Sequence, residues 1–377
     1  MKIGFVFDDT LDSYDGVAQY VKTLGSWLNS QGHEVRYLVG ETKMLEWSGG
    51  KVYSLAKNQK VRFNGNYLSM PLPASSRKIK KILEREQFDV LHVQVPYSPF
   101  MAQKVINNSS SSTSIIGTFH IAPHGFLSEW GSRGLKIMYG NSIKKFDQML
   151  SVSQPAADFA RRAYGIKSSI LPNVIDYEKF ASAKKSKNEA NTILFFGRLV
   201  KRKGAKELLE AFNILHKYNK KAKLIIAGKG AERKDLEERV AQLKLQEDVQ
   251  FLGFIEENDK PHLFANAEIV CYPSTGGESF GIVLIEAMAA GAGVVIGGNN
   301  PGYTSILGAK PELLFDPKNH LALAGKLSEL LDNKQLRKNL HEWQQKEVKQ
   351  YDVNIVGKKL EAIYKRAIDN RSKTRHN

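Results

Sequence analysis

Short apolar runs alternate along the chain with stretches in which apolar residues recur at helical spacing. A short apolar run fits a buried strand, whereas recurrence every third or fourth residue fits one face of a helix. The pattern predicts strands at residues 2–7, 34–39, 89–93, 114–118, 148–152, 192–196, 223–227, 249–252, 269–272 and 293–296. It predicts helices between most of them, including 17–30, 205–218 and 231–243. Such alternation is typical of parallel sheets covered by helices on both faces.

The alternation restarts near Thr192, after a polar segment at 181–190. We therefore expect two doubly wound α/β domains, at 1–177 and 191–350, and a further helix within the terminal segment 351–377. Ligands of open α/β sheets bind beyond the carboxyl ends of the strands. Two such domains that face each other place both sets of carboxyl ends at one cleft.

Composition and charge narrow the class of protein. The chain has 377 residues, of which 42% are hydrophobic and 10% aromatic, enough for packed cores. Its single cysteine, Cys271, allows no disulfide within the chain. We expect no signal peptide at the N-terminus and no membrane span, because no apolar run approaches ~20 residues. The formal charge of +16 favours an anionic partner, which is nucleic acid, an anionic lipid surface or a phosphorylated ligand.

The string ESFGIVLIE places two glutamates, Glu278 and Glu286, on either side of seven residues. Helical spacing after Gly281 puts Glu278 just before a helix N-terminus, where free amides and the helix dipole favour anions. Glu286 lies further along the same helix and is an acceptor-only group suited to ribose hydroxyls. Two solvated carboxylates on a surface helix are the alternative interpretation. The neighbouring residues favour a binding site over a surface helix, because Gly-Gly precedes the string and its last glutamate begins the sequence Glu-Ala-Met-Ala.

This string resembles the donor-site signature of the retaining glycosyltransferases of family 4. The resemblance implies the GT-B fold, in which two Rossmann-like domains face each other across a cleft and the terminal helix packs back on the first domain. It implies that the first domain binds the acceptor and the second binds a nucleoside-diphosphate sugar. It further implies that Glu278 holds the sugar hydroxyls and Glu286 the ribose. The intervening donor-binding residues are Ser279, Phe280, Gly281 and Ile282.

A second string of the resemblance follows the predicted strand 192–196. Gly-Arg followed by Lys-Gly implies that Arg198 and Lys203 bind the diphosphate, with Lys201 or Arg202 as possible substitutes for Lys203. Solvated charges at a helix start are the alternative for Lys201 and Arg202. Two more segments match the family's nucleotide pocket. They contain Gly228, in an Ala-Gly-x-Gly turn, and Phe254, beside the base.

The first domain offers weaker signals. Gly16 precedes a helix, so its backbone can approach a phosphate, although a structural turn explains one glycine equally well. The family usually has Gly-Gly-Val here, and this chain has Asp15 in place of the first glycine, which we expect to point toward the acceptor. His120 ends a predicted strand, and the resemblance implies that it contacts the donor sugar or acceptor. His124 is a weaker candidate, and a metal pair is not expected.

A basic helix follows in the segment SSRKIKKILEREQFDVLHVQ. Its cations are Arg77, Lys78, Lys80 and Lys81. A solvated face over a buried apolar stripe is the alternative, but this segment, with the preceding residues 63–65, resembles bacterial phosphatidylinositol mannosyltransferases. In those peripheral enzymes a basic helix at this place contacts anionic phospholipid. Each cation near an anionic leaflet contributes roughly 1 kcal/mol to membrane binding.

These strings predict a retaining hexosyltransferase at the cytoplasmic face of the plasma membrane. Mannose from GDP-mannose, moved onto a lipid-linked acceptor such as phosphatidylinositol, is the leading specific expectation. A UDP-sugar enzyme acting on a glycolipid or polysaccharide precursor, and an epimerase of the same fold, stay open. We expect no cofactor and no metal, because cations and helix N-termini can stabilise the leaving diphosphate.

Two other classes fit less well. A dehydrogenase should show G-x-G-x-x-G after the first strand, where this chain has DDTLDSYDG. A nucleic-acid-binding protein fits the charge, but no recognition motif or aromatic-interleaved basic patch is present.

Overall fold

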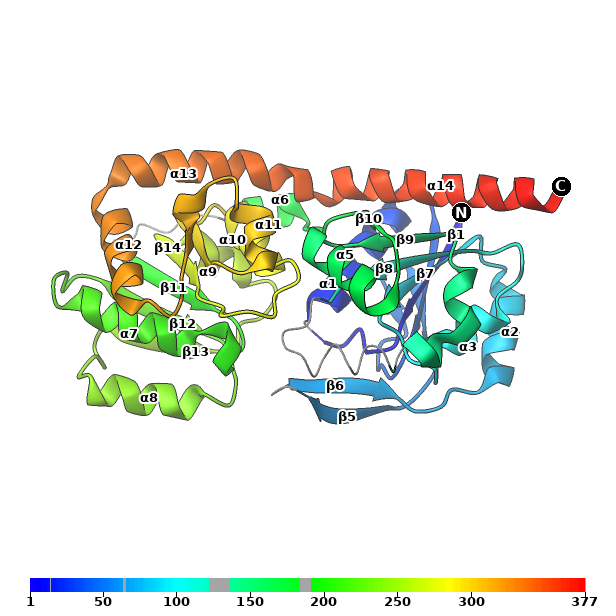
Figure 1. The fold of residues 1–377 in the computed structure, drawn as a ribbon, viewed down its shortest axis with the longest axis horizontal. Helices are drawn as coiled ribbons and strands as arrows, with labels where there is room; N and C mark the ends of the chain where they lie inside the picture. Colours follow the sequence, from blue (N-terminus) through cyan, green and yellow to red (C-terminus); the bar gives the residue numbers. More distant parts are fainter. Residues whose placement is uncertain (14, 64–65, 122–133, 135, 184–190, 377) are drawn as a thin grey trace. The chain divides into compact units, whose positions relative to one another are not determined.

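The computed structural model describes residues 1–13, 15–63, 66–121, 134, 136–183 and 191–376. The chain forms two compact units, each with its own parallel sheet (Figure 1). Unit 1 comprises Met1–Val174 with Val353–Asn377, and unit 2 comprises Ile175–Asp352. The prediction of two doubly wound α/β units is confirmed. The polar segment expected to join them includes residues 184–190, which lie outside the described residues.

Unit 1 is built on an eight-stranded sheet in the order β10-β9-β8-β7-β1-β2-β4-β3. Its strands are β1 (Lys2–Phe7), β2 (Glu34–Val39), β3 (Glu46–Trp47), β4 (Gly50–Ser54), β7 (Val90–Val95), β8 (Ser114–Phe119), β9 (Gln148–Ser151) and β10 (Ser169–Ile170). Neighbouring strands run parallel except for the β3–β4 pair at the edge. Strands β5 (Asn58–Phe63) and β6 (Asn66–Pro71) form a separate two-stranded antiparallel sheet.

The apolar pattern missed β3 to β6, because these strands are short or interrupted by polar residues. Of the segment 63–65 that carried part of the resemblance, residues 64 and 65 lie outside the described residues.

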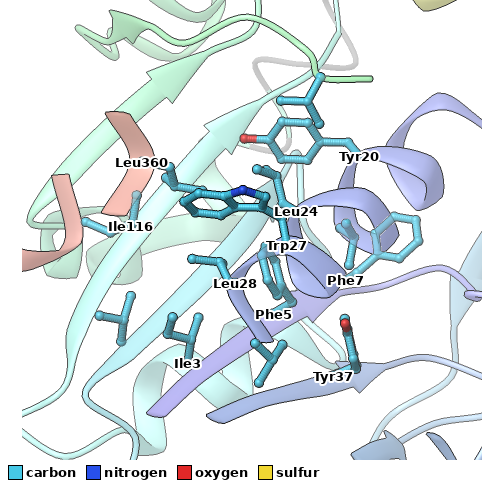
Figure 2. Close-up of a cluster of buried hydrophobic side chains, with 14 of the residues drawn as sticks. Ile3, Phe5, Phe7, Tyr20, Leu24, Trp27, Leu28, Tyr37, Ile116 and Leu360 are labelled. Atoms are coloured by element: carbon cyan, nitrogen blue, oxygen red, sulfur yellow. The ribbon is translucent and has the colours of Figure 1, made fainter. Parts of the chain in front are cut away.

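The helices of unit 1 include α1 (Gly16–Ser30), α2 (Ser76–Glu86), α3 (Ala102–Asn108), α5 (Gln154–Phe159) and α14 (Val353–His376). Successive side chains of a strand point to opposite faces of its sheet. Ile3 and Phe5 of β1 therefore share one face, where they pack in one buried cluster with Trp27 of α1 and Leu360 of α14 (Figure 2).

Helix α14 comes from the far end of the chain but belongs to the core of unit 1. Leu360 is fully buried, and such burial stabilises by about 1.5–3 kcal/mol. The indole Nε1 of Trp27 donates to Oδ1 of Asn354 (2.9 Å), and the hydroxyl of Tyr364 lies 2.6 Å from Nδ1 of His92 in β7. The last residues of the sequence thus complete the first unit.

Unit 2 has a six-stranded, wholly parallel sheet in the order β13-β12-β11-β14-β15-β16. Its strands are β11 (Thr192–Phe196), β12 (Lys223–Ala227), β13 (Val249–Gly253), β14 (Ile269–Tyr272), β15 (Val294–Gly298) and β16 (Leu314–Phe315). Its helices are α6 (Tyr177–Ala181), α7 (Ala205–His216), α8 (Arg233–Gln242), α9 (Lys260–Ala265), α10 (Ile282–Ala289), α11 (Pro301–Leu307), α12 (His320–Asp332) and α13 (Lys334–Glu347).

Candidate functional site

Two loops meet at the carboxyl edge of the unit 2 sheet. One loop, 197–204, follows β11, and the other, 273–281, follows β14. Strands β11 and β14 are parallel neighbours, so their carboxyl ends lie side by side at the edge where ligands of such sheets bind. The amide of Thr275 donates to the carbonyl of Arg202 (2.9 Å), which ties the two loops together.

Glycine lets these loops approach closely. Gly204 has φ +74°, and a Cβ there would lie 2.0 Å from the carbonyl oxygen of Pro273. Gly228 has φ +143°, and a Cβ there would lie 1.8 Å from the carbonyl oxygen of Gly197. A side chain at either position would push the backbone segments apart.

Glu278 is the centre of a compact ionic cluster. Its Oε1 lies 2.7 Å from Nη1 of Arg202 and 2.8 Å from Nζ of Lys203. The hydroxyl of Ser274 donates to the same oxygen (2.9 Å). Among the described residues no hydrogen bond reaches Oε2, so one carboxylate oxygen is fixed and the other is available to a ligand.

The cations keep Glu278 ionised. Burial acts to raise the pKa of this carboxyl, but Lys203 and Arg202 outweigh burial, and the pKa lies below its usual value. An ionised carboxylate only accepts hydrogen bonds. Glu278 is therefore suited to bind hydroxyl groups and unsuited to act as an acid at neutral pH.

Arg198 lies next to this cluster and is exposed at the end of β11. Burial lowers the pKa of Lys203, Glu278 opposes that shift, and the charges of Arg202 and Arg198 add to it. Three cations therefore share one neighbourhood around a single carboxylate. An incoming dianion, such as a diphosphate, would relieve the excess of positive charge.

Glu286 lies deeper, on α10. Its side chain is 3% exposed, and its Oε1 is 3.4 Å from Nζ of Lys260, which also lies 2.8 Å from Oε2 of Glu257. Burial raises the pKa of Glu286, while Lys260 opposes the shift. Its Oε2 has no hydrogen-bond partner among the described residues. A buried acceptor without a partner is costly unless a ligand supplies the donor.

The remaining predicted donor residues lie on the same edge. Gly281 caps α10 with φ +103°, and Ile282 is the first residue of that helix. Phe280 is buried and packs edge-on against Tyr351, with ring centroids 5.5 Å apart, whereas Ser279 is half-buried. Phe254 is 42% exposed, and the ammonium of Lys229 lies 5.2 Å from its ring centre. Phe280 thus supports the loop from within, while Phe254 presents an aromatic surface.

In unit 1, His120 directly follows β8 at the carboxyl edge of the sheet. Its ring is 7% exposed, Nε2 donates to Oε1 of Gln94 (2.8 Å), and the ring meets Tyr20 edge-on at 4.9 Å. Burial lowers its pKa to about 3. The imidazole is therefore neutral near pH 7 and has one ring nitrogen engaged in the core. His124 lies outside the described residues.

In the N-terminal loop the structure shows a capping role that the sequence analysis did not predict. Asp15, which was expected to point toward the acceptor, is the N-cap of α1. Its Oδ1 accepts from the amides of Val17 (2.9 Å) and Ala18 (3.0 Å). A carboxylate at the positive end of a helix is stabilised there. It occupies two of the amides that would otherwise be open to a phosphate beside Gly16.

The four predicted membrane cations all lie on the exposed side of α2, opposite the buried Ile79, Ile82 and Leu83. Successive residues of a helix are about 100° apart. Arg77, Lys78 and Lys81 line a groove beside β4, whereas Lys80 is absent from that lining. Three of the four predicted cations therefore line the groove, and Lys80 lies outside its lining on the same exposed side of the helix.

Two family models together match most of the chain. The model described as Glycosyltransferase Family 4 matches residues 14–179, and the model described as Glycosyl transferases group 1 matches residues 176–347. The chain is 30% identical over 388 residues to the phosphatidyl-myo-inositol mannosyltransferase of Mycobacterium tuberculosis, covering 97% of this chain and 96% of that protein. The chain belongs to the family 4 glycosyltransferases.

Two further proteins resemble this glycosyltransferase over nearly its whole length. The phosphatidyl-myo-inositol mannosyltransferase of Mycolicibacterium smegmatis is 29% identical over 374 residues, covering 97% of this chain and 93% of that protein. The crystal structure of Anabaena HepE in complex with UDP matches with a TM-score of 0.75 at 18% identity, covering 96% of this chain and 99% of HepE. The structural likeness confirms the predicted GT-B fold.

The glycosyltransferase is thus an enzyme, as predicted. None of the helices in its described part is both long and apolar enough to cross a membrane. Within the same residues, no three His, Cys, Asp or Glu side chains are grouped as a metal site would need.

Three residues of the unit 2 site were missed or undervalued by sequence reasoning. Arg202 was considered only as a substitute for Lys203, yet both cations contact Glu278. Ser274 precedes Glu278 by four residues, and a hydroxyl so close to a motif carboxylate was the available signal. Lys260 gave no local signal, because only the fold brings α9 beside α10.

The buried histidines of the glycosyltransferase give a prediction about pH. Burial lowers the pKa of His92 from 6.5 to about 3. Between these values the unfolded chain binds a proton that the folded chain does not, so acidification from pH 6.5 toward 3 destabilises the fold. We expect His92→Gln to reduce the slope of the unfolding free energy against pH by on the order of 1 kcal/mol per pH unit.

Chemical denaturation at several pH values measures this slope. Burial raises the pKa of Asp8 to about 7, which changes the slope of the unfolding free energy against pH in the opposite direction. Because Asp8 is present in both proteins, its contribution cancels when the two slopes are compared. Parallel stability curves for the two proteins would contradict the assignment.

Proposed function

We propose that the enzyme is a retaining hexosyltransferase that moves mannose from GDP-mannose onto a lipid-linked acceptor such as phosphatidylinositol, at the cytoplasmic face of the membrane. One observation carries the nucleotide-sugar part of the proposal. Glu278 is held between Lys203 and Arg202, with Oε2 left available, beside the exposed Arg198. The near full-length likeness to phosphatidyl-myo-inositol mannosyltransferases supports the sugar and the acceptor.

The chemistry follows from the charges of this cluster. The acceptor hydroxyl oxygen attacks the anomeric carbon, the bond from that carbon to the β-phosphate oxygen breaks, and the nucleoside diphosphate leaves. Arg198 and Lys203 stabilise the charge that develops on the leaving group. The hydroxyl proton passes to an oxygen of the departing phosphate, so no protein nucleophile is required.

The two glutamates act by binding in this scheme. Oε2 of Glu278 accepts from hydroxyl groups of the transferred sugar, and Oε2 of Glu286 accepts from the ribose. Phe254 lies beside the base. The cations supply the positive charge that a metal would otherwise provide, so we propose a metal-independent reaction without a cofactor.

Membrane association belongs to the same proposal. The exposed cations of α2, together with the overall formal charge of +16, favour an anionic leaflet. The enzyme would then meet its lipid acceptor as a peripheral protein. We do not propose nucleic acid as a partner.

A UDP-sugar donor is the second candidate, because the structurally similar HepE was solved with UDP. Thermal unfolding with GDP, UDP or ADP separates the candidates. A ligand that binds only the folded protein stabilises it by about 2.7 kcal/mol at a hundred times its Kd. We expect GDP to raise the Tm most. A larger shift with UDP would select the second candidate, and no shift with any nucleotide would contradict a nucleotide-sugar donor.

A further inference from the structure

A basic groove lies on the flank of unit 1, between β4 and α2. It has a volume of about 660 Å³. We call it the β4–α2 groove, and its lining residues are Lys51, Tyr53, Ser75, Arg77, Lys78, Lys81, Ile82 and Arg85. Five of these side chains are cations and none is a carboxylate. Two of the cations, Lys51 and Arg85, lie outside the basic cluster predicted from the sequence.

The cations of the groove differ in the contacts that their side chains make. Lys78 donates its ammonium to the carbonyl of Ser54 (2.8 Å). Lys51 and Arg85 each lie 5.3 Å from the ring centre of Tyr53. Arg85 also donates to the hydroxyl of Tyr53, and its Nε lies 3.5 Å from Oε1 of Glu86. In the described part of the chain, Arg77 and Lys81 have neither an ion pair nor a side-chain hydrogen bond.

Like charges along one helix face repel each other. Arg77, Lys81 and Arg85 follow one another at intervals of four residues, a spacing at which like charges destabilise a helix. Of these three cations only Arg85 has an acidic partner, Glu86, which lies behind the groove and not in its lining. A bound anion would offset the repulsion.

The wall of the groove is fixed by a buried carboxylate behind it. Glu86 accepts a hydrogen bond from Tyr53 and pairs with Nε of Arg36 (3.1 Å) and Nζ of Lys2 (3.7 Å). Burial acts to raise the pKa of Glu86, but Tyr53, Arg36 and Lys2 outweigh it, so the pKa lies below its usual value. An ionised Glu86 holds the end of α2 against three strands, and the groove is therefore preformed.

The groove runs away from the edge that carries His120. Near its start, Lys78 contacts Ser54 at the carboxyl end of β4. Beyond its other end, Glu86 contacts Lys2 at the amino end of β1. Arg85, the preceding residue, therefore lies toward the amino edge of the sheet. A molecule bound at the Arg85 end of the groove would lie on the flank of unit 1, away from the carboxyl edge where ligands of such sheets bind.

We propose that the β4–α2 groove binds the phosphate of a phosphomonoester lipid, of the phosphatidic acid class, as an anchor that is not consumed. A phosphomonoester carries close to two negative charges at neutral pH and three acceptor oxygens, which suits a groove lined by five cations. Ile82 in the lining offers an apolar contact to the lipid. This inference rests on the membrane association proposed above and adds a headgroup preference to it.

Vesicle binding tests the preference. Vesicles containing phosphatidic acid or phosphatidylglycerol are prepared at equal zeta potential, so that diffuse charge attraction is the same for both. The wild type should bind the phosphatidic acid vesicles at a lower lipid concentration. We expect the double variant Lys51→Ser with Lys81→Ser to weaken that binding on the order of tenfold and to abolish the preference.

A matched double variant removes the same charge elsewhere on unit 1. Lys57→Ser with Lys80→Ser changes two exposed cations that do not line the groove. This control should weaken binding to both vesicle types alike and retain the preference. Equal losses in the two double variants, or a wild type without preference, would overturn the groove as a phosphate site. Release from the vesicles by sub-millimolar glycerol 3-phosphate would overturn a lipid ligand in favour of a soluble one.

The lipid anchor and the proposed transferase function can be tested independently of each other. The thermal shift by nucleotide depends on unit 2 and should be the same in wild type and both double variants. A retained nucleotide shift with no vesicle preference would remove only the lipid anchor. A vesicle preference without any nucleotide shift would remove only the proposed donor.

Discussion

Replacing Arg198 by Ala should lower turnover by at least ~100-fold and leave the protein folded. The loss is typical of removing one preorganised contact to charge that develops in the transition state. Arg198 is exposed at the end of β11, so its truncation leaves no cavity in the core. The charge of Arg198 lowers the pKa of Lys203, so the two side chains are close enough for both to act on one bound diphosphate. The measurement is kcat at saturating donor, read beside the Tm.

Lys201→Ala is the matched control for Arg198→Ala. Lys201 is an exposed cation in the adjoining 3₁₀ turn Lys201–Lys203, so Lys201→Ala removes one positive charge, as Arg198→Ala does. We expect its turnover to stay within a few-fold of wild type. Equal losses in the two variants would assign the effect to net charge alone. Wild-type turnover in a folded Arg198→Ala protein would remove this arginine from the diphosphate site.

Glu278→Gln should lower turnover by a similar factor, on the order of 100-fold, and should also reduce stability. The neutral amide leaves Arg202 and Lys203 as neighbouring cations without a counter-charge. Leaving such groups unpaired costs roughly 1–3 kcal/mol. The pKa of Glu278 is lowered from 4.5, so its contribution is present above pH 4.5 and is lost as the pH falls through the lower folded value. The stability gap between variant and wild type should therefore narrow in acid.

Glu238→Gln is the corresponding control, because Glu238 is exposed on α8 and only 3.7 Å from Lys234 in a solvated pair. Glu238→Gln should have the turnover and the stability of the wild type. Normal kcat in Glu278→Gln, measured on protein that is folded at the assay temperature, would show that the carboxylate does not contact the sugar. A stability gap that does not change with pH would contradict the ionised pair.

The features that could be predicted from the sequence are those that depend on nearby residues. Strands such as Lys2–Phe7 and Thr192–Phe196 match the prediction because buried parallel strands are continuous apolar runs. Glu278 could be selected because Gly277 and Gly281 surround it at a loop and helix start. In each case the evidence lies within a few residues of the feature.

The features that could not be predicted depend on contacts between distant segments. Lys260 reaches Glu286 only because α9 and α10 are neighbours in the fold. Lys51 adds to the cations of α2 only because the short strand β4, which the apolar pattern missed, borders that helix. The capping role of Asp15 was a local feature that the family comparison obscured, since an acidic residue before a helix is a common N-cap.

Helix α14 sets an order for synthesis of the chain. The core of unit 1 includes Leu360 and Tyr364, yet residues 175–352 must leave the ribosome before that helix exists. At about 5–20 residues per second, the first unit waits on the order of ten seconds or longer with a hydrophobic face exposed. Unit 2, which is continuous in sequence, can finish first. The half that is translated first is therefore the half that matures last, and a premature stop near the end of the message would damage the opposite end of the protein.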